Sequence, residues 1–463
     1  MSGRYGGLME LVARGKKDIF FTNNPTVSFF HSVYIRAAPF TKEIYVSKPR
    51  NIPEWGRWVD FDIDHRGDIV KHVYLRIELP SWLPNAAIEA NNTGIVTDAS
   101  GVTFGWCNNI GFQLIKSVQI FQDQVLIHET YGEYLDWRLR QSYGMATAYV
   151  LSSEVGSRAE TALAIGRSAS PQFLRVPIPL FGWQHLGEPG LPTIALRNQR
   201  FRMRIYLRQL NELIVASDGR LQPSPWDKTL HIQRTAGGPI DTSLVTLPAL
   251  KHLGMSLETT QLYIAADVQT WLKAQTIRFP FVNIQSEQYT IEDSQMTAAF
   301  MGGTFTIPFA LDLSGPVERI LIGFRTEANN LAGDRTNLLS PTQQRLVNTL
   351  RLNISNNDRI KQFPVAVFRE VAAYWKSKKP ALDLINPKHI QEVYTLSFGG
   401  RDDGKPAGTL NFTRASLPVL FATLNAISYD RRNVSRKTFC ILYAESWRIW
   451  EIAGGKGKIM FDE

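Results

Sequence analysis

The stretch RFRMRIYL, residues 200–207, alternates apolar and polar side chains without a break. Successive side chains of a β-strand point to opposite faces of the sheet, so this stretch predicts a strand with one buried and one polar face. The same alternation occurs in WVDFDID (58–64), KHVYLRIELP (71–80) and GTFTIPFAL (303–311). Pro308 predicts an edge strand or a bulge, because proline cannot donate a ladder hydrogen bond. These segments predict antiparallel sheets with one buried face.

The order of such segments repeats along the chain. Each half has two alternating strands followed by a long polar stretch rich in Gly and Asn: 58–64, 72–79 and 84–111 in the first, and 304–311, 317–325 and 327–344 in the second. TTQLYIAAD (259–267) predicts the closing strand of the first half, and IRFPFVNIQ (277–285) predicts the opening strand of the second. A chain of 463 residues is long enough for two large β domains.

Helical patterns are few. Apolar spacing predicts helices over 131–141 and 366–376 and a short one over 267–273. Residues 212–250 are rich in Pro, Gly, Ser and Thr and predict a loop insertion. Strands of about six residues leave much of the chain in long loops, and loops of that length usually carry function or interfaces.

Composition places the chain among folded globular proteins. Hydrophobic residues make up 44% and charged residues 20%, which excludes a disordered or fibrous chain. No apolar run approaches the 18 or so residues of a membrane-spanning helix. The first residues lack an apolar signal segment, and Ser2 stands where myristoylation needs Gly, so we expect neither export nor lipid anchoring. Cys107 and Cys440 are the only cysteines and predict no disulfide framework.

The net charge is +9, from 51 basic and 42 acidic residues, and it favours anionic partners. An arginine stripe with Tyr206 on its face could follow phosphates: Arg197, Arg200, Arg202, Arg204 and Arg208. A basic β-sandwich nucleic-acid-binding protein is therefore an alternative, although the stripe is also typical of a solvated or subunit-facing strand. A carbohydrate-active sandwich enzyme is a third hypothesis, favoured by 11 Trp, 15 Tyr and 25 Phe.

No reactive cluster has the spacing of a catalytic or metal site. Asp60, Asp62 and Asp64 share one strand face and could bind a hard cation, but they alternate with apolar residues as a solvated face does. The eight histidines show neither HExxH nor zinc-finger spacing. GGRDDGKP (399–406) nearly spells a phosphate-binding loop, but Pro406 occupies the Ser/Thr position. We expect no catalytic residue, no metal, no cofactor and no small-molecule substrate.

Two kinds of surface site are candidates. The basic residues Arg14, Lys16 and Lys17 follow apolar positions in a short amphipathic pattern that could touch an anionic membrane or an underlying protein. Four N-x-[ST] sequons begin at Asn91, Asn353, Asn411 and Asn433. We expect Asn411 in a core strand, which leaves Asn91, Asn353 and Asn433 as candidates for glycosylation, although a cytosolic product would not meet the secretory machinery.

Six stretches form a pattern that runs from one end of the chain to the other. The first half contains GGLMELVARGKKDIFFTNNPTVSFFHSVYIRAAPF (6–40), LIKSVQIFQDQVLIHETYGEYLDW (114–137) and FLRVPIPLFGW (173–183), and the second contains LRLNISNNDRI (350–360), VYTLSFGGRDDGKPAGTLNFTRA (393–415) and FCILYAESWRIWEIAGG (439–455). The most specific positions are Gly15, Asp18, Asn24, Pro25, Phe29, Phe30, Tyr34, Arg36, Phe40, Pro406, Gly408, Asn411, Phe412 and Arg414. Together these stretches resemble the major capsid protein of nucleocytoplasmic large DNA viruses, the double jelly-roll family.

The resemblance implies an all-β fold of two tandem eight-stranded antiparallel jelly rolls, with a few short helices in loops. It implies an N-terminal extension over 1–25, a first jelly roll over 26–266, a short helical linker over 267–276 and a second jelly roll over 277–463. It also implies a non-enzymatic subunit that is made in the host cytoplasm and self-assembles as homotrimeric pseudo-hexameric capsomers into an icosahedral virion shell. The implied partners are neighbouring capsomers, minor capsid and penton proteins, and an inner membrane.

Some positions depart from the family pattern. Ala407 stands where the family often has Ser, and Lys456 and Lys458 charge a segment that is usually apolar, so the pairing of the last strand stays open. The loops 84–111, 142–172 and 212–250 lack core periodicity, and we expect them in an exposed crown or in contacts within the trimer. We expect residues 1–25 on the inner side of the shell, because they precede the first strand.

Overall fold

The computed structural model describes residues 39–80, 96–97, 103–142, 154–158, 161, 164–165, 168, 172–180, 190–196, 199–216, 221–226, 229–234, 253–302, 305–371, 392–399, 408–425 and 436–460. Its strands and helices lie in the compact unit Phe40–Glu463. Within the described part of the chain, no helix has the length and hydropathy needed to cross a bilayer.

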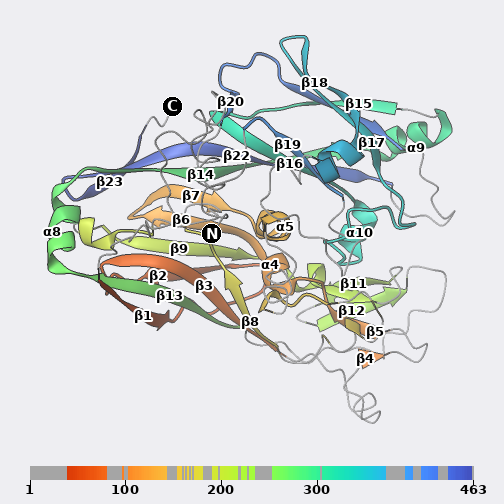
Figure 1. Ribbon diagram of the computed structural model, residues 1–463. Helices are drawn as coiled ribbons and strands as arrows, with labels where there is room; N and C mark the ends of the chain where they lie inside the picture. The colour runs from red at the N-terminus through yellow and green to blue at the C-terminus, as the bar shows by residue number, and fades with distance from the viewer. Residues whose placement is uncertain are drawn as a thin grey trace, which may run out of the picture. The chain divides into compact units, whose positions relative to one another are not determined.

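The first half of this unit contains two four-stranded antiparallel sheets (Figure 1). The first sheet has the order β1 (Phe40–Ser47), β13 (Gly254–Ile264), β3 (Ile69–Leu79) and β8 (Gln172–Pro177). The second has the order β2 (Trp58–Ile63), β9 (Phe201–Leu207), β6 (Ile115–Gln122) and β7 (Val125–Thr130). The strands predicted from the alternation at 58–64, 71–80 and 200–207 are confirmed.

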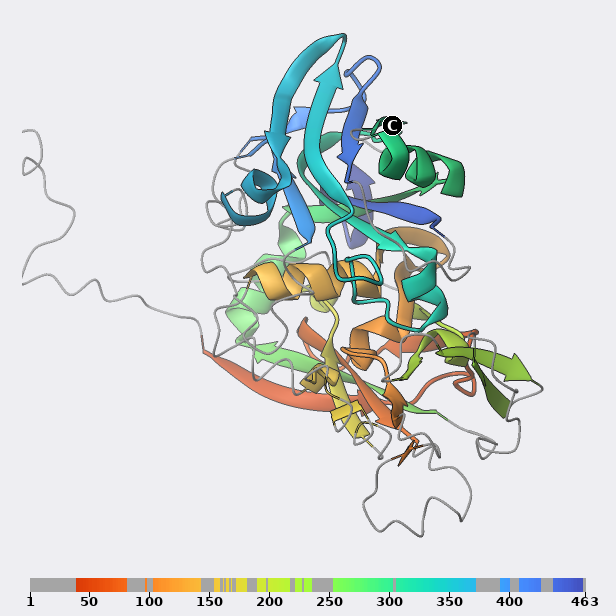
Figure 2. The ribbon, with the colours of Figure 1, turned by 90° about the vertical axis from the view of Figure 1, so that its right-hand side faces the viewer.

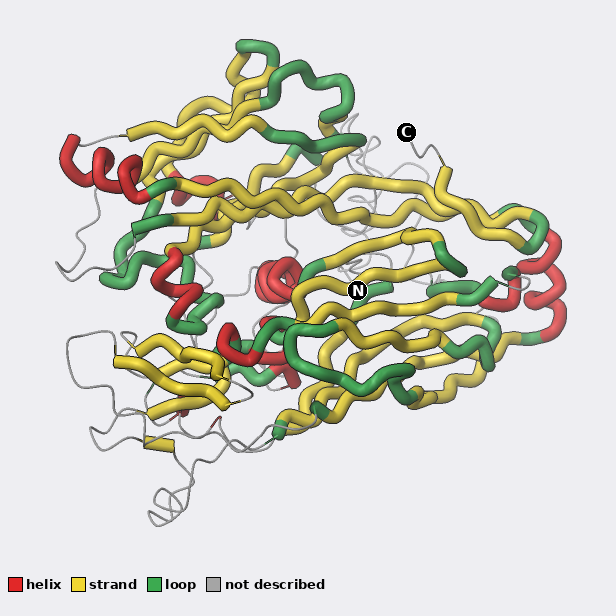
Figure 3. Tube along the Cα trace, turned by 180° about the vertical axis from the view of Figure 1, so that it is seen from behind, coloured by secondary structure: helices red, strands yellow, loops and turns green. Residues whose placement is uncertain are grey.

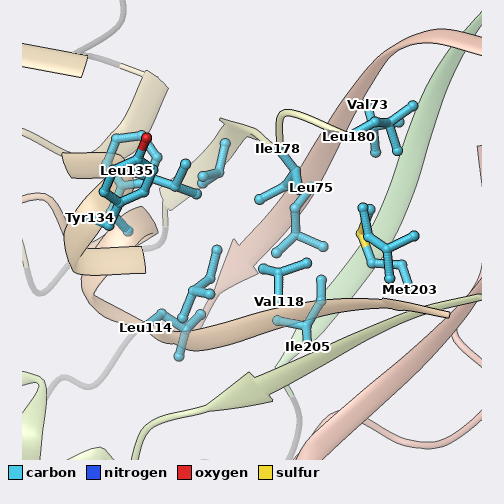
Figure 4. Packing of buried hydrophobic residues seen from close by; sticks show 14 of the residues in the cluster. Val73, Leu75, Leu114, Val118, Tyr134, Leu135, Ile178, Leu180, Met203 and Ile205 are labelled. Atoms are coloured by element: carbon cyan, nitrogen blue, oxygen red, sulfur yellow. The ribbon is translucent and has the colours of Figure 1, made fainter. Parts of the chain in front are cut away.

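The apolar faces of these two sheets meet in one core. Val73 and Leu75 project from β3 toward Val118, Met203 and Ile205 on the opposite sheet (Figure 4). All five side chains are almost fully buried. Burying a side chain of this size contributes roughly 1.5–3 kcal/mol, so the alternation seen in the sequence is what holds the two sheets together.

The second half repeats this arrangement (Figure 3). One sheet has the order β14 (Ile277–Ile291), β22 (Thr438–Ala453), β16 (Pro316–Thr326) and β19 (Val393–Ser397), with β20 (Leu410–Asn411) paired to β16 and β23 (Lys456–Met460) paired to β22. The other has the order β15 (Phe305–Ala310), β21 (Val419–Leu424), β17 (Val347–Ile354) and β18 (Asn357–Pro364). Pro308 lies in β15 at the edge of its sheet, as its missing N–H predicted.

The two halves have the same strand order. In each half the first strand pairs with the last, and the last pairs with the third: β1, β13 and β3 in the first half, and β14, β22 and β16 in the second. The opposite sheets match in the same way, with β7 and β18 at equivalent edges. This order of two facing antiparallel sheets is that of a jelly roll, so the chain contains two jelly rolls in tandem.

The helices are short. They are α4 (Ile110–Gln113), α5 (Gly132–Ser142), α8 (Ala266–Ala274), α9 (Asp293–Gly302), α10 (Glu327–Leu331), the 3₁₀ turns η1 (Thr193–Ala195) and η2 (Leu210–Glu212), and the π-turn η3 (Val367–Val371). The helices expected over 131–141 and 267–273 are confirmed as α5 and α8. Of the helix expected over 366–376, the described residues contain only the five-residue η3.

Parts of the predicted loops are packed structure. The strand β5 (Thr103–Trp106), at the end of the first polar stretch, pairs with β4 (Val96–Thr97) and with β10 (Ile214–Ala216), which lies in the predicted insertion. Trp106 and Ile110 are buried in the first core. A separate hairpin joins β11 (Leu221–Trp226) to β12 (Thr229–Arg234). Much of 84–102, 143–171 and 217–252, which the sequence predicts in an exposed crown or in trimer contacts, lies outside the described residues.

The polar stretch 327–344 is also not an open loop. Thr326 caps α10 by accepting a hydrogen bond from the backbone N–H of Asn329. The Asn329 side chain then donates to the carbonyl oxygens of Asn337 (3.0 Å) and Leu339 (2.7 Å). Asn side chains in this stretch form hydrogen bonds with its backbone N–H and C=O groups. Because these polar groups have partners, the stretch can be packed against the rest of the protein. Composition alone did not distinguish this packed turn from a solvated loop.

Alanine substitutions at two glycines would measure how tightly this turn packs on the first roll. Gly333 and Gly315 both have positive φ, +72° and +71°, but a Cβ at Gly333 would collide with the carbonyl oxygen of Ile214 on β10, whereas Gly315 has open space. Gly315→Ala should cost about 1–2 kcal/mol from the left-handed backbone alone. Gly333→Ala should lower the melting temperature by several degrees more, and equal melting temperatures would show that the turn does not press on β10.

Candidate functional site: surfaces for assembly

The outward face of the sheet β14-β22-β16-β19 is covered by the first roll. We call the contact of β7 and α5 with β14, β16 and β22 the seam (Figures 1 and 2). Leu442 and Ala444 point into the second core, whereas Ile441 and Tyr443 join the core of the first roll. The run FCILYA (439–444) is apolar on both faces, which is typical of a strand buried on both sides. This signal was available in the sequence and was missed.

Two carboxylates form buried ion pairs across the seam. Glu445 of β22 forms an ion pair with Arg138 (Oε1 to Nε 2.7 Å) and accepts a hydrogen bond from the Tyr134 hydroxyl (3.0 Å), and both partners lie on α5. Glu133 of α5 pairs with Arg325 of β16. These ion pairs are buried between the two rolls, away from water. They therefore hold α5 of the first roll at a defined position on the sheet of the second.

The electrostatic field around Glu133 is strongly positive. Burial alone would raise the pKa of this carboxyl, but the guanidinium groups of Arg325, Arg335 and Arg208 together hold its pKa below the ordinary value. Burial also lowers the pKa of Arg335, to about 9, and the nearby Arg325 and Arg208 add to that effect. The charged form of Glu133 is therefore part of the folded structure at neutral pH.

Aromatic rings fill the rest of the seam. The Tyr443 ring contacts the rings of Tyr131, Tyr134 and Trp137 at centroid distances of 5.5, 5.9 and 5.3 Å. Trp450, farther along β22, lies edge-on to Phe201 of β9 at 6.1 Å. Such pairs contribute about 0.5–1.5 kcal/mol beyond the area that they bury.

The C-terminal hairpin β22–β23 is tied to the first roll. Gln122 of β6 accepts from Trp450 Nε1 (3.3 Å) and donates to the Gly457 carbonyl (2.7 Å). Lys458 pairs with Glu451 across the hairpin (3.3 Å), and Lys456 pairs with Ala453 in the ladder. The two lysines that depart from the family pattern therefore lie in a strand that is antiparallel to β22.

The aspartates and arginines singled out in the sequence are partners of one another. Cross-strand register places Asp60 opposite Arg204 and Asp62 opposite Arg202. Asp60 is buried and accepts from Arg204 Nε (2.8 Å) and Nη2 (3.0 Å), and this hydrogen bonding raises the pKa of Arg204. The interpretation of Asp60 as part of a solvated face is wrong, because the sequence does not show which strands pair.

This pairing of aspartates with arginines weakens two alternatives, a metal site on the aspartates and a nucleic-acid-binding surface on the arginines. Asp62 pairs with Arg50 at 2.6 Å and Asp64 lies 3.6 Å from Arg66, so these carboxylates face arginines. Arg208 is buried beside Glu133, whereas Arg200 is exposed and Arg197 lies outside the described residues. Among the residues that can be placed, no three His, Cys, Asp or Glu side chains are arranged to hold a metal ion. Three of the placed arginines of the stripe, Arg202, Arg204 and Arg208, therefore lie beside the carboxylates of Asp60 and Glu133.

The cysteines lie in separate cores. Burial raises the pKa of Cys107 to about 12, and burial also raises the pKa of Cys440. Both side chains are buried thiols, in the first and second core respectively. Neither has the thiolate character of a reactive cysteine.

The other predicted sites are mostly beyond the described residues. Arg14, Lys16, Lys17, Asn91 and Asn433 all lie there, as does the segment 400–407 of the phosphate-loop-like motif. Asn353 lies in β17, half-buried, and its amide donates to Asp358 Oδ1 (3.0 Å). Asn411 is exposed in the two-residue strand β20, so the expectation of a core position is wrong.

Among the edge strands that the structure describes, β1 of the first roll has no buried residue, and neither have β18, β20 and β23 of the second. On β1 the side chains of Phe40, Ile44 and Val46 are 61%, 55% and 51% exposed. They lie on the outward face of their sheet, together with Phe173 of β8, which is 78% exposed. Because β1 and β8 are opposite edges of this sheet, these apolar side chains lie at both edges of its outward face and do not form one continuous patch.

Residues 28–265, more than half of the chain, match the family model described as the major capsid protein N-terminus. The chain belongs to the major capsid protein family. "Probable capsid protein 4" of Acanthamoeba polyphaga mimivirus is 28% identical over 223 residues, 45% of this chain and 38% of that protein. The "Major capsid protein" of Pyramimonas orientalis virus is 28% identical over 218 residues, 47% of this chain and 50% of that protein. This capsid-family chain thus spans half or less of the length of these relatives.

Solved structures show the same fold. VP54 of PBCV-1 superposes with a TM-score of 0.69 at 15% identity, covering 94% of this chain and 100% of that one. The Faustovirus major capsid protein superposes with a TM-score of 0.60 at 13% identity, covering 95% of this chain and 94% of that one. The capsid-family chain therefore has the double jelly-roll fold. The relatives carry the names of structural proteins rather than enzymes, in agreement with the expected non-enzymatic role.

Breaking one seam ion pair should be costly. Glu133→Gln leaves Arg325 buried without its counter-charge, and such a change typically costs about 3–5 kcal/mol. Asp62→Asn removes a pair with Arg50 in which both side chains are about half exposed, and should cost no more than about 1 kcal/mol. Urea unfolding of the two variants measures both values. Equal, small losses would mean that the seam pair does not hold the rolls together.

His128 makes the seam sensitive to acid. Its ring is buried on β7, edge-on to Phe281 of β14 at 6.1 Å, and burial followed by the nearby Arg448 lowers its pKa to about 3. The unfolded chain therefore binds this proton first, and stability falls as pH drops below about 6.5, by up to about 1.4 kcal/mol per pH unit. His128→Gln should flatten the dependence between pH 6.5 and 5, above the range in which carboxylates titrate. An unchanged slope would show that His128 is not neutral in the fold.

Proposed function

We propose that this protein is the major capsid subunit of a large DNA virus, three copies of which form a pseudo-hexameric capsomer of an icosahedral shell. The observation that carries the proposal is the buried seam between two rolls of identical strand order. A covalent pair of such rolls is a stiff unit with two similar halves. Three of these units supply six similar rolls, which is the number that a pseudo-hexameric ring needs.

The energetics of the seam support a structural role. Buried ion pairs and interlocked rings hold α5 and β22 together, so the two rolls move as one body. A subunit that tiles a shell needs this stiffness, because each contact must be made at the same angle in every copy. The mechanism is geometric and hydrophobic, with no bond made or broken.

The remaining expectations belong to the same proposal. The subunit is located in the virion after synthesis in the host cytoplasm, and its partners are neighbouring capsomers, minor capsid and penton proteins, and an inner membrane facing Arg14, Lys16 and Lys17. Asn91, Asn353 and Asn433 are its candidate modification sites. Its domains are an extension over 1–25, rolls over 26–266 and 277–463, and a linker over 267–276. The position of α8 between β13 and β14 supports that linker.

Native mass spectrometry of the purified full chain tests the proposal. We expect a dominant species with three times the mass of one 52.4 kDa chain, at micromolar concentration and near-neutral pH. A protein that stays monomeric at every concentration would contradict it. Retention on heparin with a steep salt dependence would favour the nucleic-acid alternative, and a weak dependence is expected because Asp60 engages Arg204 and Asp62 lies opposite Arg202.

A further inference from the structure

We propose that the seam binds one small oxoanion, of the size of inorganic phosphate, among the guanidinium groups of Arg208, Arg325 and Arg335. The site lies within a single folded chain, so this inference goes beyond the proposed function and does not depend on assembly. It follows from buried arginine N–H groups that have no acceptor in the protein.

Both rolls contribute arginines to this part of the seam. Arg325 lies on β16 and Arg335 lies in the turn after α10, and Arg325 Nη1 donates to the carbonyl oxygen of Arg335 at 2.9 Å. Arg208 directly follows β9 of the first roll, where its backbone N–H donates to the carbonyl oxygen of Leu114 at 2.9 Å. Against the effect of burial, all three guanidinium groups lower the pKa of Glu133, so they lie around one carboxylate.

Arg208 is the member of this group without a counter-charge. It is 8% exposed, and its buried Nε–H has no acceptor. Arg325 pairs with Glu133, and Arg335 Nη1 lies 3.2 Å from Glu212 Oε1, whereas Arg208 forms no ion pair with the residues that the structure describes. A buried charge without a partner is strongly destabilising, and arginine does not escape this cost by losing its proton. A bound anion would supply the missing partner.

The unused donors of this group suit an oxoanion. The Nε–H groups of Arg325 and Arg335 are also buried without an acceptor. Glu133 has no oxygen to spare, because Oε1 accepts from Arg325 and Oε2 accepts from the Tyr443 hydroxyl at 3.4 Å. Guanidinium groups bind phosphate-like anions through several N–H donors at once, and such an anion has enough oxygens to accept from more than one arginine.

The charge balance also favours an anion. The groups whose charges act on the pKa of Arg335 are Arg325, Arg208, Glu133 and Glu212, so three arginines share two carboxylates. One of these carboxylates, Glu212, is 34% exposed and partly solvated. The neighbouring Asp334 is half-buried, and its Oδ1 accepts from the Thr336 hydroxyl at 3.4 Å. A positive charge therefore remains in excess where water is largely excluded.

Burial limits the size of the ligand. The side chains of Arg325 and Glu133 are 2% and 3% exposed, and that of Arg335 is 10% exposed. A nucleotide, a phosphopeptide or a lipid headgroup carries a large group that such a site cannot enclose. The ligand is therefore a free ion, and by contacting arginines of both rolls it would add to the contacts that hold the rolls together.

The test compares the full-length wild-type chain with Arg208→Gln, which removes the unpaired charge, and with Arg208→Lys, which keeps the charge without the guanidinium. Arg66→Gln is the matched control, because the Arg66 side chain is 63% exposed and faces only Asp64 at 3.6 Å. Thermal unfolding is followed by circular dichroism in potassium phosphate and in potassium chloride of equal ionic strength. Low millimolar phosphate keeps its general stabilising effect on proteins small. Calorimetric titration with phosphate, and separately with ATP, measures binding directly.

We expect one phosphate ion to bind per wild-type chain and no binding of ATP. Phosphate should raise the melting temperature of the wild-type chain and of Arg66→Gln by several degrees, because a ligand that binds only the folded state stabilises it. The rise should be smaller for Arg208→Lys and absent for Arg208→Gln.

Two results would overturn the inference: a wild-type chain that takes up no phosphate in the titration, or Arg208→Gln with the full phosphate-dependent rise. ATP that binds as tightly as phosphate would contradict the closed site. If Arg208→Gln does not fold, the wild-type titration and the comparison with Arg208→Lys still decide, because an unchanged rise in Arg208→Lys would exclude the guanidinium as a ligand. Trimer formation is measured separately, so none of these results bears on the proposed function.

Discussion

The sheet β14-β22-β16-β19 must be covered on both faces, and the rest of the molecule is organised around that requirement. Its inner face closes the second jelly roll, and its outward face carries Tyr443, Leu321 and the charged Glu445 and Arg325. If this face were exposed to water, its apolar area would not be buried. If it were covered without partners for Glu445 and Arg325, their charges would be buried unpaired, at a high cost in free energy. Helix α5 of the first roll supplies Arg138, Glu133 and the aromatic rings that meet both needs. The two rolls are therefore one structural unit.

Much of the fold could be predicted from the sequence because a jelly-roll strand leaves a local signature. The alternation in 58–64, 71–80 and 200–207 reflects one buried and one outward face, and Pro308 marked its sheet edge correctly. Where a strand is buried on both faces the alternation disappears, which is why FCILYA did not reveal the seam. The packed turn at 327–344 was missed because its polar side chains bond to its own backbone, a property that depends on conformation rather than composition.

The candidate site was harder to predict, because it consists of contacts between residues distant in sequence. Asp60 and Arg204 each looked like solvated or ligand-binding groups when taken alone. Only the register of β2 against β9 shows that they neutralise each other. The same holds for Glu133 and Arg325, which are 192 positions apart. Charge patterns along a strand indicate a polar face, but the partner strand determines whether that face is free to bind.

The central claim is that the seam makes the two rolls of one chain a single structural unit. Hydrogen–deuterium exchange on the dilute, unassembled protein tests this most directly. Amides of β7 and β14 should be protected there, because the seam is internal to the chain, and Glu133→Gln should lower the protection of both strands. Fast exchange of β7 and β14 in the dilute, folded protein would contradict the account.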